Sequence, residues 1–148
     1  MLHRIEEHQR ARSATWTTLE VTTHIASQID HKIGEAQVVI IDCITLLVNN
    51  IFSQYIDPTS EQIDASLIEK KVTSEINELV DCINHIDASF IIVTNEVGTG
   101  LVPANKVGRL YRDLLGKANQ LLAQRVDEVY LMVVGLPVPI KPSQYFGA

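Results

Sequence analysis

The sequence is poor in aromatic residues, cysteine and positive charge, and each shortage excludes a class of protein. Aromatic residues make up 5% of the 148 residues, so Leu, Ile and Val must fill most of the core. The two cysteines, Cys43 and Cys82, are isolated and form no CxxC pair, which indicates buried, reduced thiols rather than a disulfide or a zinc site. A net charge of −6 argues against a general nucleic-acid-binding surface and leaves only a local basic patch open.

Long apolar runs and a signal peptide are also missing. No apolar run approaches the roughly 18 residues that cross a bilayer, and the first residues, MLHRIEEHQRARS, are charged, unlike a signal peptide. We therefore expect a soluble, cytoplasmic protein without membrane insertion. With 46% hydrophobic residues in 148, the chain has the size of a single domain, 1–148, with one core.

Three short apolar runs, at 37–43, 89–95 and 129–135, predict β-strands. They are rich in β-branched residues and apolar without alternation, which is typical of parallel strands covered on both faces. A weaker β-segment is expected at 16–21, where threonines surround one tryptophan.

Between these runs, apolar residues recur every three or four positions and predict helices. A long helix is expected around 63–83, with Thr59 or Ser60 as its N-cap. Another helix, of about twenty residues, is expected around 110–122. Shorter helices are expected at 23–33 and 44–54. The order of these elements predicts an α/β fold with a mostly parallel sheet flanked by helices.

The chain begins inside a predicted helix. Ile5 and His8 lie three positions apart, and neither a cap nor a strand precedes them. Doubly wound domains usually open with a strand. We therefore expect the chain to start in the middle of the fold.

Two acidic residues follow predicted strands. Asp42 comes after VVII and Glu96 after FIIVTN, and ligands of open α/β sheets bind beyond the carboxyl ends of the strands. Nucleotide-binding folds use an aspartate in this place to hold a metal ion against phosphates. The simpler interpretation of Asp42, a helix N-cap, stays open.

A glycine-containing loop and two arginines come next. The glycines of EVGTGLVP, 96–103, allow backbone amides to approach an anion, although their spacing matches neither phosphate-binding fingerprint. A plain strand-to-helix turn explains this loop equally well. Arg109 and Arg112 lie one helical turn apart, where they can grip a phosphate together, or simply be solvated.

His8 has basic neighbours, Arg4, Arg10 and Arg12. Like charge disfavours the imidazolium, so His8 is a candidate neutral nucleophile, with arginines to hold the phosphates that it attacks. The alternative is a surface histidine on a basic amphipathic helix. No Cys/His cluster indicates zinc, and we predict no resident metal site in the chain.

Three stretches together resemble one family, the bifunctional adenosylcobinamide kinase / adenosylcobinamide-phosphate guanylyltransferases of cobalamin biosynthesis. They are RIEEHQRARSATWTTLE (4–20), VVIIDCITLLVNNIF (38–52) and the segment 94–141. The last is the most specific, because Asn-Glu-Val-Gly, Val-Pro, Arg-x-x-Arg-Asp and Gly-x-x-Asn-Gln follow one another in the family's order. The resemblance covers nearly the whole chain, apart from the helix around 55–87.

The resemblance implies a RecA-like P-loop fold and two reactions. In the first, ATP or GTP phosphorylates the aminopropanol hydroxyl of adenosylcobinamide. In the second, GTP guanylylates a histidine with loss of pyrophosphate, and GMP then passes to the cobinamide phosphate. The resemblance also implies Mg²⁺ with the nucleotide, no tightly bound cofactor, and a homo-oligomer, since relatives form trimers.

The family's site residues carry over by position. The nucleophilic histidine falls on His8. The residues that match nucleotide-contacting positions are Gln9, Arg10, Ala11, Arg12, Glu20 and Asp42. Candidate contacts to phosphate or substrate are Glu96, Arg109 and Arg112.

The chain departs from the family's pattern at its beginning. No G-x-x-x-x-G-K-[ST] motif occurs in the 148 residues, so the usual cradle of the triphosphate is missing. The family's first strand, first helix and second strand are missing too. Glu7 replaces the second histidine of many members, and Asp42 is one methylene shorter than the glutamate of some relatives.

We therefore expect an N-terminally truncated, partial nucleotide-binding domain. A sheet without its central strand leaves strand edges unpaired, so the isolated chain is expected to be marginally stable or to oligomerise. The alternative to an active enzyme is an impaired remnant or a split-gene subunit that only binds nucleotide or a partner chain.

Overall fold

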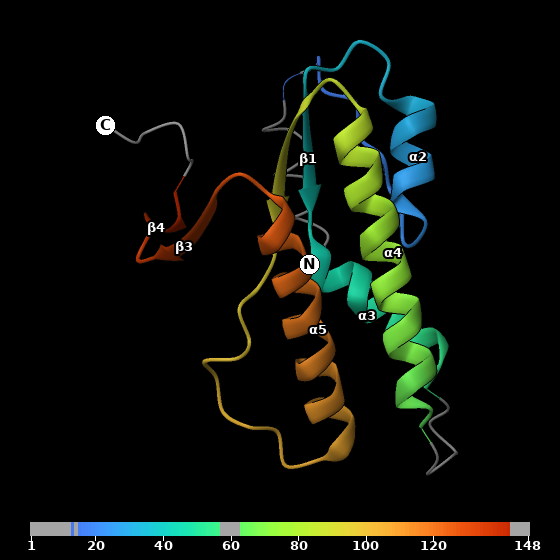
Figure 1. Ribbon diagram of the computed structural model, residues 1–148, viewed down its shortest axis with the longest axis vertical. Helices are drawn as coiled ribbons and strands as arrows, with labels where there is room; N and C mark the ends of the chain where they lie inside the picture. The colour runs from blue at the N-terminus through green and yellow to red at the C-terminus, as the bar shows by residue number, and fades with distance from the viewer. Residues whose placement is uncertain (1–12, 14, 57–62, 143–148) are drawn as a thin grey trace.

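The computed structural model describes residues 13, 15–56 and 63–142, which form an α/β arrangement (Figure 1). In chain order the elements are α2 (Ile25–Lys32), β1 (Val38–Asp42), α3 (Ile44–Gln54), α4 (Ala65–His85), β2 (Ser89–Val93), α5 (Lys106–Arg125), β3 (Val129–Val133) and β4 (Leu136–Lys141). The four predicted helices within these residues are confirmed, as are the strands expected at 37–43, 89–95 and 129–135. The helix expected around Ile5 and His8 lies outside the described residues.

Strands β1 and β2 form a parallel pair, in register from Val38 opposite Ser89 to Asp42 opposite Val93. Alternate side chains pack against the core: Val39, Ile41, Phe90 and Ile92. The intervening side chains are exposed: Val38, Ile40, Ile91 and Val93. The prediction that these strands are covered on both faces is wrong, because the described helices cover one face only.

The core lies between this strand pair and helices α3, α4 and α5. The largest fully buried side chains come from these three helices: Ile44, Leu47, Val48, Ile68, Ile76, Leu79, Leu114 and Leu115. Helix α4 packs against α2, α3 and α5. Each buried aliphatic side chain contributes about 1.5–3 kcal/mol, so this helical layer is the rigid support behind the strand ends.

Strand β3 does not join the parallel pair, contrary to the prediction. It pairs with β4 in an antiparallel hairpin, which lies to one side of the molecule, away from β1 (Figure 1). Val134 and Gly135 both have positive φ, 48° and 82°, as a two-residue hairpin turn requires. Strand β4 was not predicted because Pro137 and Pro139 argue against a strand.

Two further local predictions need correction or completion. The segment 16–21 is not a strand, because no described strand pairs with it and threonine propensity alone supplies no backbone partner. Helix α4 is capped by Asp64, whose Oδ1 accepts the Leu67 N–H at 2.9 Å. The expected caps, Thr59 and Ser60, lie outside the described residues.

Two expectations from composition can be compared with the structure. Cys43 and Cys82 are free thiols, but each is half-buried rather than buried. Within the described part of the chain, no helix combines the length and apolarity that a bilayer span requires.

Candidate functional site

The candidate site lies where β1 and β2 end. Asp42, the last residue of β1, pairs with Val93, the last residue of β2, so residues 94–104, here called the site loop, begin beside it and then run to the start of α5 (Figure 1). Cys43, not Asp42, is the N-cap residue of α3, and its side chain makes no capping hydrogen bond. No hydrogen bond or ion pair with a described residue involves the exposed Asp42 carboxylate. The helix-cap interpretation of Asp42 is therefore wrong, and its carboxylate faces solvent at the strand end.

Side chains from α3 and α5 hold the start of the site loop. The Asn95 N–H donates to Thr45 Oγ1 at 2.9 Å, and the Asn95 carbonyl accepts from Asn119 Nδ2 at 3.1 Å. Asn119 Oδ1 accepts from the Thr94 hydroxyl at 2.7 Å. The Tyr111 hydroxyl in turn donates to the Thr45 carbonyl at 3.0 Å. The backbone after β2 is thus fixed between two helices.

Glu96 turns back onto its own loop. Its Oε1 accepts the Gly98 N–H. A Cβ at Gly98 would stand 2.6 Å from that oxygen, closer than real Cβ atoms come, so any other residue at position 98 would require the Glu96 carboxylate to shift. Glu96 remains exposed, and its contact to nucleotide or substrate stays a prediction.

Both predicted arginines contact carbonyls of the site loop. Arg112 Nη2 donates to the Gly98 carbonyl. Arg109 Nη1 donates to the carbonyls of Pro103, at 3.0 Å, and Ala104, at 2.7 Å. Arg112 Nη1 is buried without a hydrogen-bond partner among the described residues. The arginines therefore brace the loop at two separate points, and their joint grip on a phosphate stays a prediction.

The remaining predicted site residues are not brought to this place within the described structure. Glu20 is exposed, and no interaction between described residues joins it to Asp42 or to the site loop. Its segment is tied to α3 by Asn50, whose Nδ2 donates to the Thr22 carbonyl at 3.1 Å. The predicted site residues of the basic N-terminal segment lie outside the described residues: His8, Gln9, Arg10, Ala11 and Arg12.

Three residues that organise the site were missed from the sequence. Thr45, Tyr111 and Asn119 were given no role, although Asn119 belongs to the Gly-x-x-Asn-Gln pattern. Burial raises the pKa of Tyr111, with a smaller contribution from the charge of Cys43, so the hydroxyl stays protonated and donates at neutral pH. The sequence signal that could have identified these three residues is a polar side chain next to the apolar stripe of a predicted helix.

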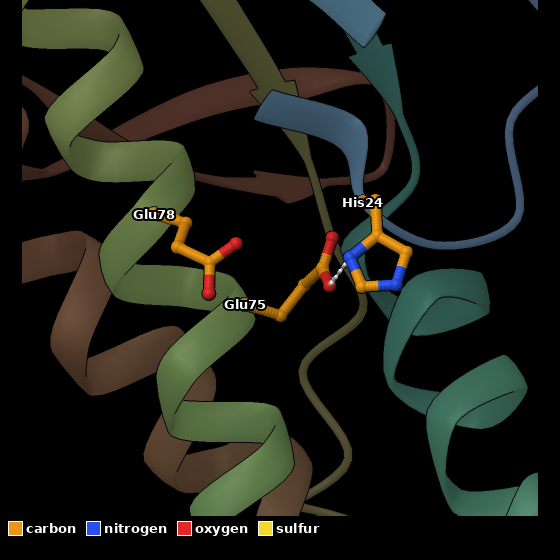
Figure 2. Close-up of side chains that lie close together, drawn as sticks. All are labelled: His24, Glu75 and Glu78. Atoms are coloured by element: carbon orange, nitrogen blue, oxygen red, sulfur yellow. Dashed lines mark ion pairs between the residues drawn. The ribbon is translucent and has the colours of Figure 1, made fainter. Parts of the chain in front are cut away.

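A second polar cluster joins helices α2 and α4 (Figure 2). The potential metal-ligand atoms of His24, Glu75 and Glu78 all lie within 4.8 Å of one another. The Glu75 side chain is 8% exposed, and its Oε2 lies 3.7 Å from His24 Nδ1. Its Oε1 accepts the Ile25 N–H at 2.9 Å, whereas His24, the N-cap residue of α2, makes no side-chain capping bond. We interpret Glu75 as the N-terminal cap of α2, supplied from α4.

Comparisons with known proteins place these features in a wider context. The profile of the family described as cobinamide kinase / cobinamide phosphate guanyltransferase matches residues 1–140, which include all the site residues named above. The chain is 36% identical over 142 residues to the bifunctional adenosylcobalamin biosynthesis protein CobU of Escherichia coli (strain K12), covering 95% of this chain and 78% of that protein.

Two further relatives show the same extent of similarity. The protein of the same description from Salmonella typhimurium (strain LT2) is 37% identical over 142 residues, covering 95% of this chain and 78% of its own length. The bifunctional adenosylcobalamin biosynthesis protein CobP of Pseudomonas aeruginosa is 31% identical over 141 residues, covering 95% and 75%.

Proposed function

Because the chain belongs to the cobinamide kinase / cobinamide phosphate guanyltransferase family of cobalamin biosynthesis, we propose that it phosphorylates adenosylcobinamide and transfers GMP from GTP to adenosylcobinamide phosphate. The observation that supports this most is the exposed Asp42 carboxylate at the end of β1, where the site loop begins. Two arginines brace the later part of that loop. A RecA-like P-loop fold is part of this proposal, supported by the parallel pair and its helical layer.

His8 is proposed as the nucleophile of GMP transfer. A neutral imidazole nitrogen attacks the α-phosphorus of GTP, an N–P bond forms, and the bond to the bridging oxygen breaks as pyrophosphate leaves. A phosphate oxygen of adenosylcobinamide phosphate then attacks the same phosphorus and releases the imidazole. The residues proposed to contact the guanine nucleotide are Gln9, Arg10, Ala11, Arg12 and Glu20.

Asp42 fits the Mg²⁺ that accompanies the nucleotide. Mg²⁺ prefers oxygen ligands, and commonly takes one or two carboxylates together with substrate phosphates. Asp42 supplies such a carboxylate, exposed and without a partner among the described residues. The ion, when bound, neutralises phosphate charge, while Glu96 and Arg112 are proposed to orient the phosphate or the cobinamide substrate.

A second candidate function is a chain that only binds nucleotide or a partner protein. It is favoured by the exposed apolar side chains on the outer face of β1 and β2, among them Ile40 and Ile91, since exposed apolar surfaces usually mark contacts with other chains. The two candidates differ in whether a guanylylated protein forms.

The experiment is incubation of the protein with α-labelled GTP and Mg²⁺. We expect label to accumulate on the wild-type protein and to move to added adenosylcobinamide phosphate. His8→Ala should take no label, whereas the control His31→Ala, which changes an exposed histidine of α2, should be labelled like the wild type. Equal labelling of His8→Ala, or no label on any protein at millimolar GTP, would contradict the proposal.

A further inference from the structure

The backbone of Asn95 is held from both sides, while its side chain stays exposed. Its N–H is bound by Thr45 of α3 and its carbonyl by Asn119 of α5. Loops that follow strands are usually the mobile part of a fold. A double clamp at this position therefore fixes the direction in which the next residue, Glu96, leaves the sheet.

Both polar atoms of the Asn119 side-chain amide form hydrogen bonds, and these bonds fix the orientation of the amide. Its Nδ2 donates to the Asn95 carbonyl, and its Oδ1 accepts from the Thr94 hydroxyl. A flipped amide would place Oδ1 against the Asn95 carbonyl, where two acceptors repel. Aspartate supplies only the acceptor and leucine supplies neither group, so a side-chain amide is what this position requires.

Asn119 contributes little to the packing of α5. The core face of this helix consists of Leu114, Leu115, Ala118 and Leu122, whereas Asn119 is half-buried beside the site loop. Replacing Asn119 therefore leaves the hydrophobic contacts of α5 in place and removes the two loop contacts. The geometry assigns its effect to the loop rather than to the fold.

We propose that Asn119 is a positioning residue of the site. By fixing Thr94 and Asn95, it keeps Glu96 beyond the end of β2, in the arrangement that the substrate meets. Asn119 itself acts through these residues and needs no contact with substrate. The functional part of this inference rests on the proposed function, since that function defines the reaction that the site performs.

The first test measures the loop without any activity assay. Amide hydrogen exchange at Asn95 and Gly98 is followed by NMR in the wild type, Asn119→Leu, Asn119→Asp and the control Gln120→Leu. Gln120 is the exposed neighbour on α5. Loss of the clamp should speed exchange at both amides about tenfold in Asn119→Leu, consistent with the loss of a hydrogen bond in a locally opening segment. Asn119→Asp should show a similar increase because it loses the donor to Asn95, and Gln120→Leu should match the wild type.

The second test separates positioning from a general loss of stability. GMP transfer is measured in the wild type, Asn119→Leu, Glu96→Gln and the double variant. We expect kcat/KM to fall about tenfold in Asn119→Leu, and the same substitution to cost far less in the Glu96→Gln background, because both changes disturb the same group. Melting temperatures of Asn119→Leu and Gln120→Leu should agree closely.

Three results would overturn the proposal: unchanged exchange in Asn119→Leu, faster exchange with unaltered kcat/KM, or losses that simply add in the double variant. If the wild-type protein takes no label from GTP, the proposed function fails, whereas the exchange comparison still decides whether Asn119 fixes the loop.

Discussion

Tyr111 joins two helices at the point where the site loop begins. Its hydroxyl donates to the Thr45 carbonyl at 3.0 Å, and its ring packs edge-to-face with that of Phe52, with ring centroids 5.5 Å apart. Thr45 in turn accepts the Asn95 N–H. The Tyr111 side chain therefore supports the contact between α3 and α5. It also supports Thr45, which holds Asn95 near the start of the site loop.

We predict that Tyr111→Phe lowers the free energy of unfolding by about 1 kcal/mol at neutral pH, since the Thr45 carbonyl loses its donor. Burial raises the pKa of Tyr111, so the native state favours the neutral phenol. The neutral phenol therefore contributes to the free energy of unfolding. This contribution is fully present below the unfolded-state pKa of about 10 and is lost as the pH rises through the higher native-state pKa. Urea unfolding between pH 7 and pH 11 should therefore show a smaller alkaline loss in Tyr111→Phe than in the wild type.

The control for this prediction is Tyr55→Phe, which removes a hydroxyl at the end of α3 and leaves Tyr111 intact. In this variant, the free energy of unfolding should still fall at alkaline pH because Tyr111 is present and ionises. The same dependence on pH in Tyr111→Phe and in the wild type would show that the half-buried phenol of Tyr111 does not couple ionisation to folding.

The sequence predicted some site residues and missed others for a physical reason. Asp42 and Glu96 were identified because they follow apolar strands, and parallel strands end at one edge of a sheet. Thr45 and Asn119 contact Asn95 across 50 and 24 positions of the chain. Hydrophobic period locates their helices but does not say which polar side chain faces the loop.

Helix α2 depends on α4 for its N-terminal cap. Glu75, on α4, accepts the Ile25 N–H across 50 positions, while the residues of the first turn of α2 include no acid. A negative carboxylate at a helix N-terminus is also favourable for the helix dipole. The contact therefore links the stability of the short α2 to the long α4.

We predict that Glu75→Ala lowers the free energy of unfolding by about 1–2 kcal/mol, as the loss of an N-cap usually does. Glu78→Ala should change it by less than about 0.5 kcal/mol, because Glu78 is exposed and bonded to Ser74 of its own helix. Thermal unfolding measures both. If instead EDTA lowered the wild-type melting temperature and Zn²⁺ restored it only with His24 and Glu75 intact, the cluster would be a metal site rather than a cap.

At the scale of elements, helices were easier to predict than strand pairing. The period of α4 and α5 is a local pattern, and their buried stripes follow it. Pairing depends on residues far apart in the chain, and an apolar run such as Val129–Val133 suits a parallel sheet and a hairpin alike. The turn at Val134 and Gly135 determines that this run forms a hairpin. Two consecutive residues with positive φ reverse the chain within two residues, so β4 pairs directly with β3.

At the scale of the molecule, both small sheets formed by the described residues expose apolar side chains. On the outer face of the parallel pair, Ile40 and Ile91 are 46% and 52% exposed and lie directly opposite each other. On the hairpin, Met132, Leu136 and Ile140 are each more than 60% exposed. Large apolar surfaces on soluble proteins usually mark contacts with other chains, and two-stranded sheets are seldom stable without further cover.

We predict that the purified chain self-associates through the outer face of β1 and β2. Light scattering after size exclusion should give a mass above 16.5 kDa that rises with protein concentration. The double variant Ile40→Lys/Ile91→Lys should shift the chain toward the monomer, because two adjacent like charges cannot be buried together without a large desolvation cost. Gln120→Lys adds a charge at an exposed position of α5 and should give the same mass as the wild type. A wild-type protein that stays monomeric at high concentration and melts sharply and reversibly would refute this expectation, since its exposed strand face would then be stable in water.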